Sequence, residues 1–237
     1  VLAAGSALAW LAVFALVREA PPARSRQEDS VLAAARKFVA LFTMPQTLGI
    51  VALGAVTYAS FITLRGLWLG PLLIERYGFS LLQSGNVALA VSVVSLFGPP
   101  VFGKLDPKAP TRRRWIVGFT LGMAALFALL AVARNPWAAV AASLATGFLT
   151  GFIVWQYADV RLAYPEALTG RAMAVFTMTM FLGIALMQWV TGVAASVAQA
   201  HQADPFAAVL FTVAALVCAG ALAFAWLPAP HAPAGAA

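Results

Sequence analysis

Seven apolar runs, separated by short charged or turn-forming segments, decide what this chain can fold into. A helix needs about 20 apolar residues to cross the hydrocarbon core of a bilayer, and most of the runs have that length. Hydrophobic residues make up 62% of the 237 residues and charged residues only 10%, far from the balance of a soluble domain. The sequence therefore predicts an all-α, polytopic membrane bundle of seven transmembrane helices.

The runs also suggest how the chain is divided. Residues 1–17 begin in apolar sequence with neither an initiator methionine nor a signal peptide, so we expect a longer protein whose helix is cut here. Residues 18–47 form a polar linker, in which Ser30 can begin an interfacial helix. A six-helix domain should follow at 48–227, and residues 228–237 should be a disordered tail. Its spans are expected at 48–74, 82–103, 115–133, 137–160, 172–197 and 206–227.

Basic residues lie mostly on one side of the predicted membrane. Of the 15 lysines and arginines, all but Arg65, Arg76 and Arg134 fall in the linker, in segment 104–114 or in segment 161–171. Loops rich in these residues stay in the cytoplasm, so we expect the linker and the C-terminus to be cytoplasmic, in a bacterial inner membrane. The same distribution explains the net charge of +7 without a nucleic-acid partner.

Arg65 is the charged residue nearest the middle of a predicted span. An arginine at that depth is costly, faces a protein or water-filled interior, and is functional by default, although neutralisation by carbonyl groups is the alternative. Helical spacing places Tyr58, Phe61 and Trp68 on the same face. We therefore expect these four side chains to form one wall of a substrate cavity.

Polar side chains distinguish interior spans from lipid-facing ones. The runs at 115–133 and 206–227 have almost none, so they should face lipid. The other four spans carry the remaining candidates for substrate binding, which are Asn86, Gln156, Tyr157, Thr177, Phe181 and Gln188. For the threonines and Gln188 the alternative is ordinary bonding within or between helices. Glycine spacing at Gly118 and Gly122, and at Gly147 and Gly151, indicates close helix packing.

A second set of residues suggests a gate at the basic side: Gly103, Asp106, Arg112, Arg113, Asp159 and Arg161. Asp159 is either a gate carboxylate that pairs with the basic loop or an interfacial acid held by Arg161 or water. Enzyme chemistry is not expected, because both histidines and all three lysines lie outside the spans and Cys218 is the only cysteine. We expect neither a cofactor nor a metal.

Three stretches resemble the C-terminal half of a major facilitator superfamily transporter. Residues 66–85, GLWLGPLLIERYGFSLLQSG, resemble its seventh helix and the turn into the eighth, and residues 102–115, FGKLDPKAPTRRRW, resemble its basic loop between helices eight and nine. In that loop the glycine-to-acid spacing is one residue shorter than in the family pattern. Residues 164–176 resemble the junction of helices ten and eleven, and Gly183 with Gly192 fits the glycine pattern of helix eleven.

The resemblance implies alternating access, in which two six-helix halves rock about a midplane site. The partners would be a small-molecule substrate, the lipid bilayer and the missing N-terminal half. We expect secondary transport of a small organic solute, with an organic anion as one candidate because of Arg65. A multidrug or amphiphile exporter of the same superfamily is the alternative, and a non-transporting receptor or assembly subunit is a third. No acid lies at mid-membrane in these spans, so a proton-coupling carboxylate would belong to the missing half.

Overall fold

A computed structural model describes residues 2–16, 36 and 40–227 of the chain, which fall into two compact units, Val1–Val39 and Ala40–Ala237. The first unit contains the apolar helix α1 (Leu2–Leu16), which has 15 residues and is shorter than the other candidate spans. The expected linker helix, at residues 31–42, lies almost wholly outside the described residues, and so does the expected tail. The second unit holds the predicted functional residues.

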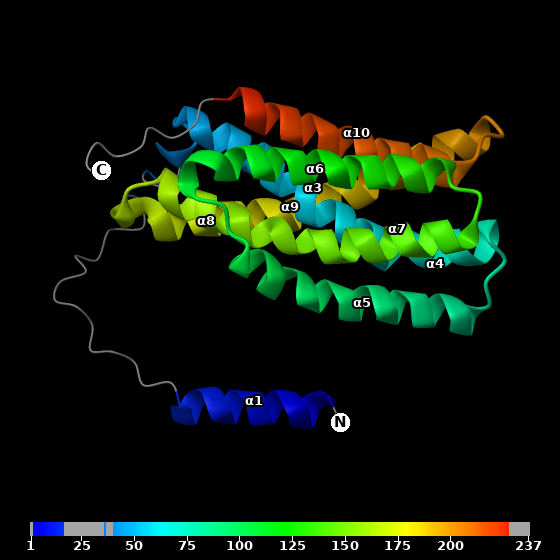
Figure 1. Ribbon diagram of the computed structural model, residues 1–237, viewed down its shortest axis with the longest axis horizontal. Helices are drawn as coiled ribbons and strands as arrows, with labels where there is room; N and C mark the ends of the chain where they lie inside the picture. Colours follow the sequence, from blue (N-terminus) through cyan, green and yellow to red (C-terminus); the bar gives the residue numbers. More distant parts are fainter. Residues whose placement is uncertain (1, 17–35, 37–39, 228–237) are drawn as a thin grey trace. The chain divides into compact units, whose positions relative to one another are not determined.

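Six helices of the second unit are long and apolar enough to cross a membrane. Their segments, drawn in Figure 1, are α3 (Pro45–Thr63), η1 (Leu64–Trp68), α4 (Leu69–Pro71), η2 (Leu72–Arg76), α5 (Leu81–Lys104), α6 (Ala109–Val132), α7 (Pro136–Leu149), η3 (Thr150–Phe152), α8 (Ile153–Ala163), α9 (Glu166–Ala200) and α10 (Pro205–Trp226). The all-α membrane bundle predicted from the sequence is confirmed. The six spans predicted after the linker each overlap an observed one, whereas the span predicted at residues 1–17 corresponds to the short helix α1.

Local sequence explains where several of these helices begin. Proline is the first residue of α3, α7 and α10, where its fixed φ suits a helix and its missing N–H costs nothing. Asn135 and Asp204 cap α7 and α10 by accepting hydrogen bonds from the first backbone N–H groups. Ser80 and Gln83 form a reciprocal capping box at the start of α5. At Gly78, a φ of +71° turns the chain from η2 toward α5.

The antiparallel helices bring the segments 104–109 and 163–166 and the end of α10 to one end of the bundle, which we call the basic end. Of the six candidate spans, the helix from Pro45 to Arg76 is the most buried. Inside the bundle, 61% of its most apolar stretch is buried, compared with 17% for α5. It contacts α9 and α10, and α10 also packs against α6 and α9. The helix that carries Arg65 is therefore held by neighbours along most of its length.

Glycines permit the closest helix contacts. A Cβ at Gly183 would overlap the backbone of Ala55, and one at Gly98 would lie 3.0 Å from the Cα of Gly151. At Gly147 a Cβ would lie 3.0 Å from the carbonyl oxygen of Val91, so the close packing expected at Gly147 and Gly151 is confirmed. The same expectation is wrong for Gly118 and Gly122, since nothing lies within 4 Å of a Cβ at either position.

We predict that Gly183→Ala destabilises the bundle by about 1–3 kcal/mol, because the added methyl group forces α9 away from α3. Gly192→Ala on the same helix is the matched control, since a Cβ there meets nothing within 4 Å. Alanine is the better helix former by up to about 1 kcal/mol, so this variant should be neutral or stabilising. Thermal unfolding of both variants in detergent checks the prediction, and equal midpoints would contradict it.

Candidate functional site

The helix that carries Arg65 is not a regular α-helix. Two π-helical segments, η1 and η2, flank the single α-turn that ends at Pro71. Proline lacks an N–H and its ring collides with the carbonyl four residues earlier, and a π-turn is one way for a helix to absorb such a conflict. The N–H of Leu69 accordingly bonds to the carbonyl of Leu64, five residues earlier. Such wide turns occur frequently at functional sites.

The side chains that were expected to form one cavity wall lie in different surroundings. Arg65 is exposed, and its Nε donates to Ser92 Oγ of α5 at 2.8 Å. Trp68 is half-buried and its Nε1 donates to Thr191 Oγ1 of α9 at 3.1 Å. Phe61 departs from the expected face, because it is only 4% exposed and lies against Gly147. Tyr58 is half-buried.

Gln156 lies in the bundle core instead of lining an open cavity. It is 1% exposed, and its Oε1 accepts a hydrogen bond from Thr57 Oγ1 at 3.0 Å, which joins α8 to α3. Its buried Nε2 has no hydrogen-bond partner among the described residues. Gln156 and Asp159 border a narrow crevice that has no room for a water molecule. The expected substrate contact at Gln156 would therefore require the helices to move apart.

Tyr157 and Thr177 meet between α8 and α9, as a shared site requires. The Tyr157 hydroxyl lies 3.4 Å from Thr177 Oγ1 and 3.5 Å from the sulfur of Met180, and its ring packs edge-on against Phe176 at 5.0 Å. The other candidates are more open: Asn86 and Phe181 are exposed and Gln188 is half-buried. Of the predicted substrate residues, Tyr157 and Thr177 lie together, whereas Arg65, Trp68 and Gln156 bond to residues outside the predicted set, which are Ser92, Thr191 and Thr57.

Several of the residues predicted to form a gate contact one another at the basic end, and the gate itself stays a prediction. Both carboxylate oxygens of Asp106 accept hydrogen bonds from Arg112, through Nε and Nη2, at 2.8 Å each. The Arg112 side chain is only 9% exposed, and its Nη1 has no hydrogen-bond partner in the described part of the chain. A bidentate pair of this kind is a strong, directional contact.

Arg113 and Asp159 extend this group of charges. Arg113 donates to the carbonyl oxygens of Phe224 and Leu227 at the end of α10, and its guanidinium lies 4.4 Å from the centroid of the Phe224 ring. Asp159 lies within electrostatic range of Arg113 and Arg112 but forms no ion pair in the described part of the chain, so both interpretations of this acid stay predictions. Gly103 and Arg161 are both exposed.

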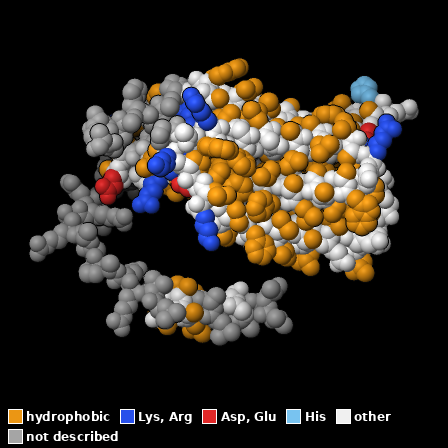
Figure 2. Space-filling model, viewed as in Figure 1, with side chains coloured by type: hydrophobic (Ala, Val, Ile, Leu, Met, Phe, Trp, Pro, Cys, Tyr) orange, Lys and Arg blue, Asp and Glu red, His pale blue; other side chains and the backbone are white. Residues whose placement is uncertain are grey.

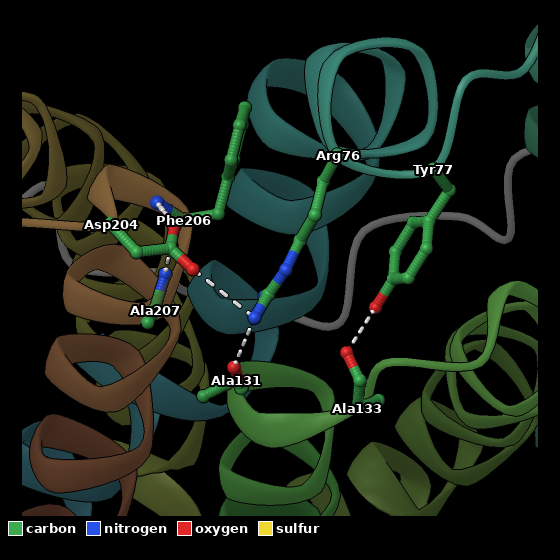
Figure 3. Close-up of polar contacts among 7 residues, drawn as sticks. All are labelled: Arg76, Tyr77, Ala131, Ala133, Asp204, Phe206 and Ala207. Carbon is green, nitrogen blue, oxygen red and sulfur yellow. Dashed lines mark hydrogen bonds and ion pairs between the residues drawn. The ribbon is translucent and has the colours of Figure 1, made fainter.

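At the opposite end, a polar clamp that the sequence analysis missed ties three helices together (Figure 3). Arg76 pairs with Asp204 at 3.1 Å and donates to the carbonyl oxygen of Ala131 at 2.9 Å. The Tyr77 hydroxyl donates to the carbonyl oxygen of Ala133 at 2.7 Å. Asp204 also caps α10. The Asp-Pro pair at the start of α10 was the available sequence signal for the cap, but nothing in it indicates Arg76 as partner.

Two tyrosines outside the spans, the half-buried Tyr77 and the buried Tyr164, act as hydrogen-bonding phenols. Burial raises the pKa of Tyr77, with Asp204 adding to the rise and Arg76 opposing it. Burial likewise raises the pKa of Tyr164, against the lowering effect of its 2.7 Å hydrogen bond with Thr47. A raised pKa keeps each phenol protonated at neutral pH, so the Tyr77 link to α6 and the Tyr164 link to α3 persist there.

Comparison with known families identifies the chain. The family model described as Major Facilitator Superfamily matches residues 1–188. The match covers most of the chain, which therefore belongs to that superfamily, a family of membrane transporters and not of enzymes. No curated protein matches the chain.

The clamp yields a stability prediction. Asp204→Asn keeps a capping oxygen but loses the charge that pairs with Arg76, and should lower stability by about 0.2–1 kcal/mol. Asp204→Ala loses both functions and should cost about 1 kcal/mol more. Thermal unfolding in detergent measures the difference, with the exposed neighbour Glu75→Gln as control. If the asparagine and alanine variants unfolded at the same temperature, the capping role would be excluded.

Proposed function

As a member of the superfamily the chain is part of a membrane transporter, and we propose that it carries the second six-helix half. In this proposal the transporter moves a small organic anion by alternating access, with Arg65 as the charge that holds it. The six spans, the position of the basic loop and the irregular seventh helix support this reading. The linker and the basic end would lie in the cytoplasm of a bacterial cell.

One observation carries the choice of an anion: Arg65 has only a hydroxyl for a partner. Its Nε bonds to Ser92, and no ion pair in the described part of the chain involves it. The Ser92 hydroxyl in turn donates to the carbonyl oxygen of Ala88, so it is oriented to accept from Arg65. The remaining guanidinium donors are available for a carboxylate or phosphate, which arginine binds with two parallel hydrogen bonds.

The other candidate residues fit supporting roles around this anchor. Trp68 is fixed by Thr191 and Tyr157 lies beside Thr177, so these pairs present rigid aromatic walls from three helices. Asn86 and Gln188 would add polar contacts from α5 and α9. The cavity itself would be completed by the first half of the transporter. The isolated half would bind poorly and would not transport.

An amphiphile exporter remains the second candidate because of the exposed apolar side chains of α9. Phe181 is 64% exposed and Trp189 is 68% exposed. A broad aromatic surface of this kind suits a lipophilic substrate, provided that the surface faces the central cavity and not the lipid. The two candidates differ in which class of substrate is transported less well when Arg65 is replaced.

We predict that Arg65→Gln lowers uptake of organic anions by at least about tenfold, because a charge-assisted hydrogen bond is lost. The measurement is solute uptake by the full-length protein in liposomes, over a panel of anionic, neutral and cationic solutes. Arg134→Gln, which removes an exposed arginine at a helix end, is the control and should transport normally. If the protein transports lipophilic cations or neutral drugs, and Arg65→Gln leaves that transport unchanged, the result would favour the exporter.

The gate is tested separately, at the Asp106–Arg112 pair. Asp106→Asn removes the countercharge of a buried guanidinium, which we expect to destabilise the closed basic end by about 1 kcal/mol or more. Spin-label distances across that end in the full-length protein should then shift several-fold in population toward the open form. Arg134→Gln, at the opposite end of the bundle, is the control. An unaltered distribution in Asp106→Asn would remove the gate role.

A further inference from the structure

A second cavity lies at the basic end, away from Arg65 and between α5, α6 and α8. It has a volume of about 400 Å³, within the range of small-molecule sites. Phe102, Phe119 and Trp155 form its wall, with ring centroids 5.0 to 5.2 Å apart in edge-to-face contacts. The Trp155 Nε1 donates to the carbonyl oxygen of Phe102 at 2.7 Å. With that polar group engaged, the wall offers only ring surface to an occupant.

Three basic residues are sequence neighbours of residues that line this cavity. Along the loop, Lys104 adjoins the lining residue Leu105, Lys108 adjoins the lining residue Pro107, and Arg114 adjoins the lining residue Trp115. All three basic side chains are exposed, and none forms an ion pair within the described ranges 40–227. The acid of the loop, Asp106, is already paired with Arg112. Figure 2 shows lysine and arginine side chains gathered at this end of the bundle.

The mouth of the cavity lies where the spans end, at the level of the lipid headgroups. Leu105 is 62% exposed and Trp115 is 53% exposed, and tryptophan is enriched at this level of a membrane. An aromatic cavity accepts an acyl chain, whereas the exposed cations attract a negatively charged phosphate. Basic pockets between helices on the cytoplasmic side bind anionic lipid headgroups in this way.

We propose that this cavity is a binding site for an anionic phospholipid, which inserts an acyl chain against Trp155 while Lys104 and Lys108 hold its headgroup. A free phosphate would not use the aromatic wall, and a zwitterionic lipid would not use the uncompensated charge. The site is separate from the Arg65 region, and its occupancy is measured without transport. The lipid proposal and the anion-transport proposal can therefore fail independently.

Quenching of Trp155 tests the proposal directly. Trp155 is 3% exposed, so lipids that merely surround the protein do not reach it. In the full-length protein, reconstituted with Trp155 as the single tryptophan, acyl-brominated phosphatidylglycerol should quench its fluorescence at several-fold lower mole fraction than acyl-brominated phosphatidylcholine. A variant with Trp226 alone is the control. That residue is 81% exposed at the same end and should be quenched similarly by both lipids.

Two variants assign the preference to the cavity and its rim. The double variant Lys104→Gln with Lys108→Gln should abolish the preference for phosphatidylglycerol, whereas Arg134→Gln at the opposite end should keep it. Thr111→Phe fills the cavity from its exposed edge and should protect Trp155 from both lipids. Equal quenching by the two lipids, or a preference that survives the lysine changes, would overturn the proposal.

A second measurement guards against misfolding of the single-tryptophan protein. Native mass spectrometry of the full-length protein with its natural tryptophans, in an equal mixture of the two lipids, should show retained phosphatidylglycerol. The retained lipid should be lost in the lysine double variant. Retention of both lipids in equal amounts would again contradict the proposed site.

Discussion

The close approach of backbones at glycine is the constraint on which the rest of this bundle depends. Lipid is as apolar as the helix surfaces, so burial of apolar area contributes little to association, and packing must supply the attraction. At Gly183 the backbone of α9 lies against that of α3, and at Gly220 α10 approaches Ala52 and Val56. These contacts place the Pro45–Arg76 helix at the centre. The position of Arg65 is therefore set by the packing of α9 and α10 against the earlier part of the same helix.

The arginines at the two ends of the bundle hold neighbouring segments together through their polar partners. Arg76 and Arg112 each have a carboxylate partner, and Arg113 has two carbonyl oxygens and an aromatic face. The contacts of Arg76 and Arg113 join elements far apart in sequence, namely η2 to α10 and α6 to α10. They sit at the two ends of the bundle, so each end is held together by cations while the middle is held by small residues.

Much of the fold could be predicted from hydrophobic runs alone, because run length and charge position are local properties. The observed bounds of the six spans lie close to those expected, and prolines and capping residues account for several helix starts. Glycine spacing was less informative. The spacing shows that small residues lie on one helix face, but not whether another helix packs against that face. A neighbouring helix packs against Gly147, whereas nothing lies close to Gly118.

The candidate site was harder to predict for two physical reasons. The shared face of Phe61 and Arg65 assumed a regular helix, and the π-turn before Pro71 changes the register at that point. The second reason is distance in sequence: Ser92, Thr191 and Asp204 become partners only through packing. By contrast, Asp106 and Arg112 are close in sequence and form a bidentate contact in the structure, whereas their role in a gate stays a prediction.

Arg65 differs from the other arginines in its surroundings. A structural arginine in this protein is recognisable, because Arg76 pairs with the carboxylate of Asp204 and donates to the carbonyl oxygen of Ala131. Arg65 has an exposed guanidinium, one neutral partner and an irregular backbone around it. Such a charge is costly near the middle of a membrane unless water or an anion reaches it. The anion proposed as substrate would supply a countercharge while it is bound.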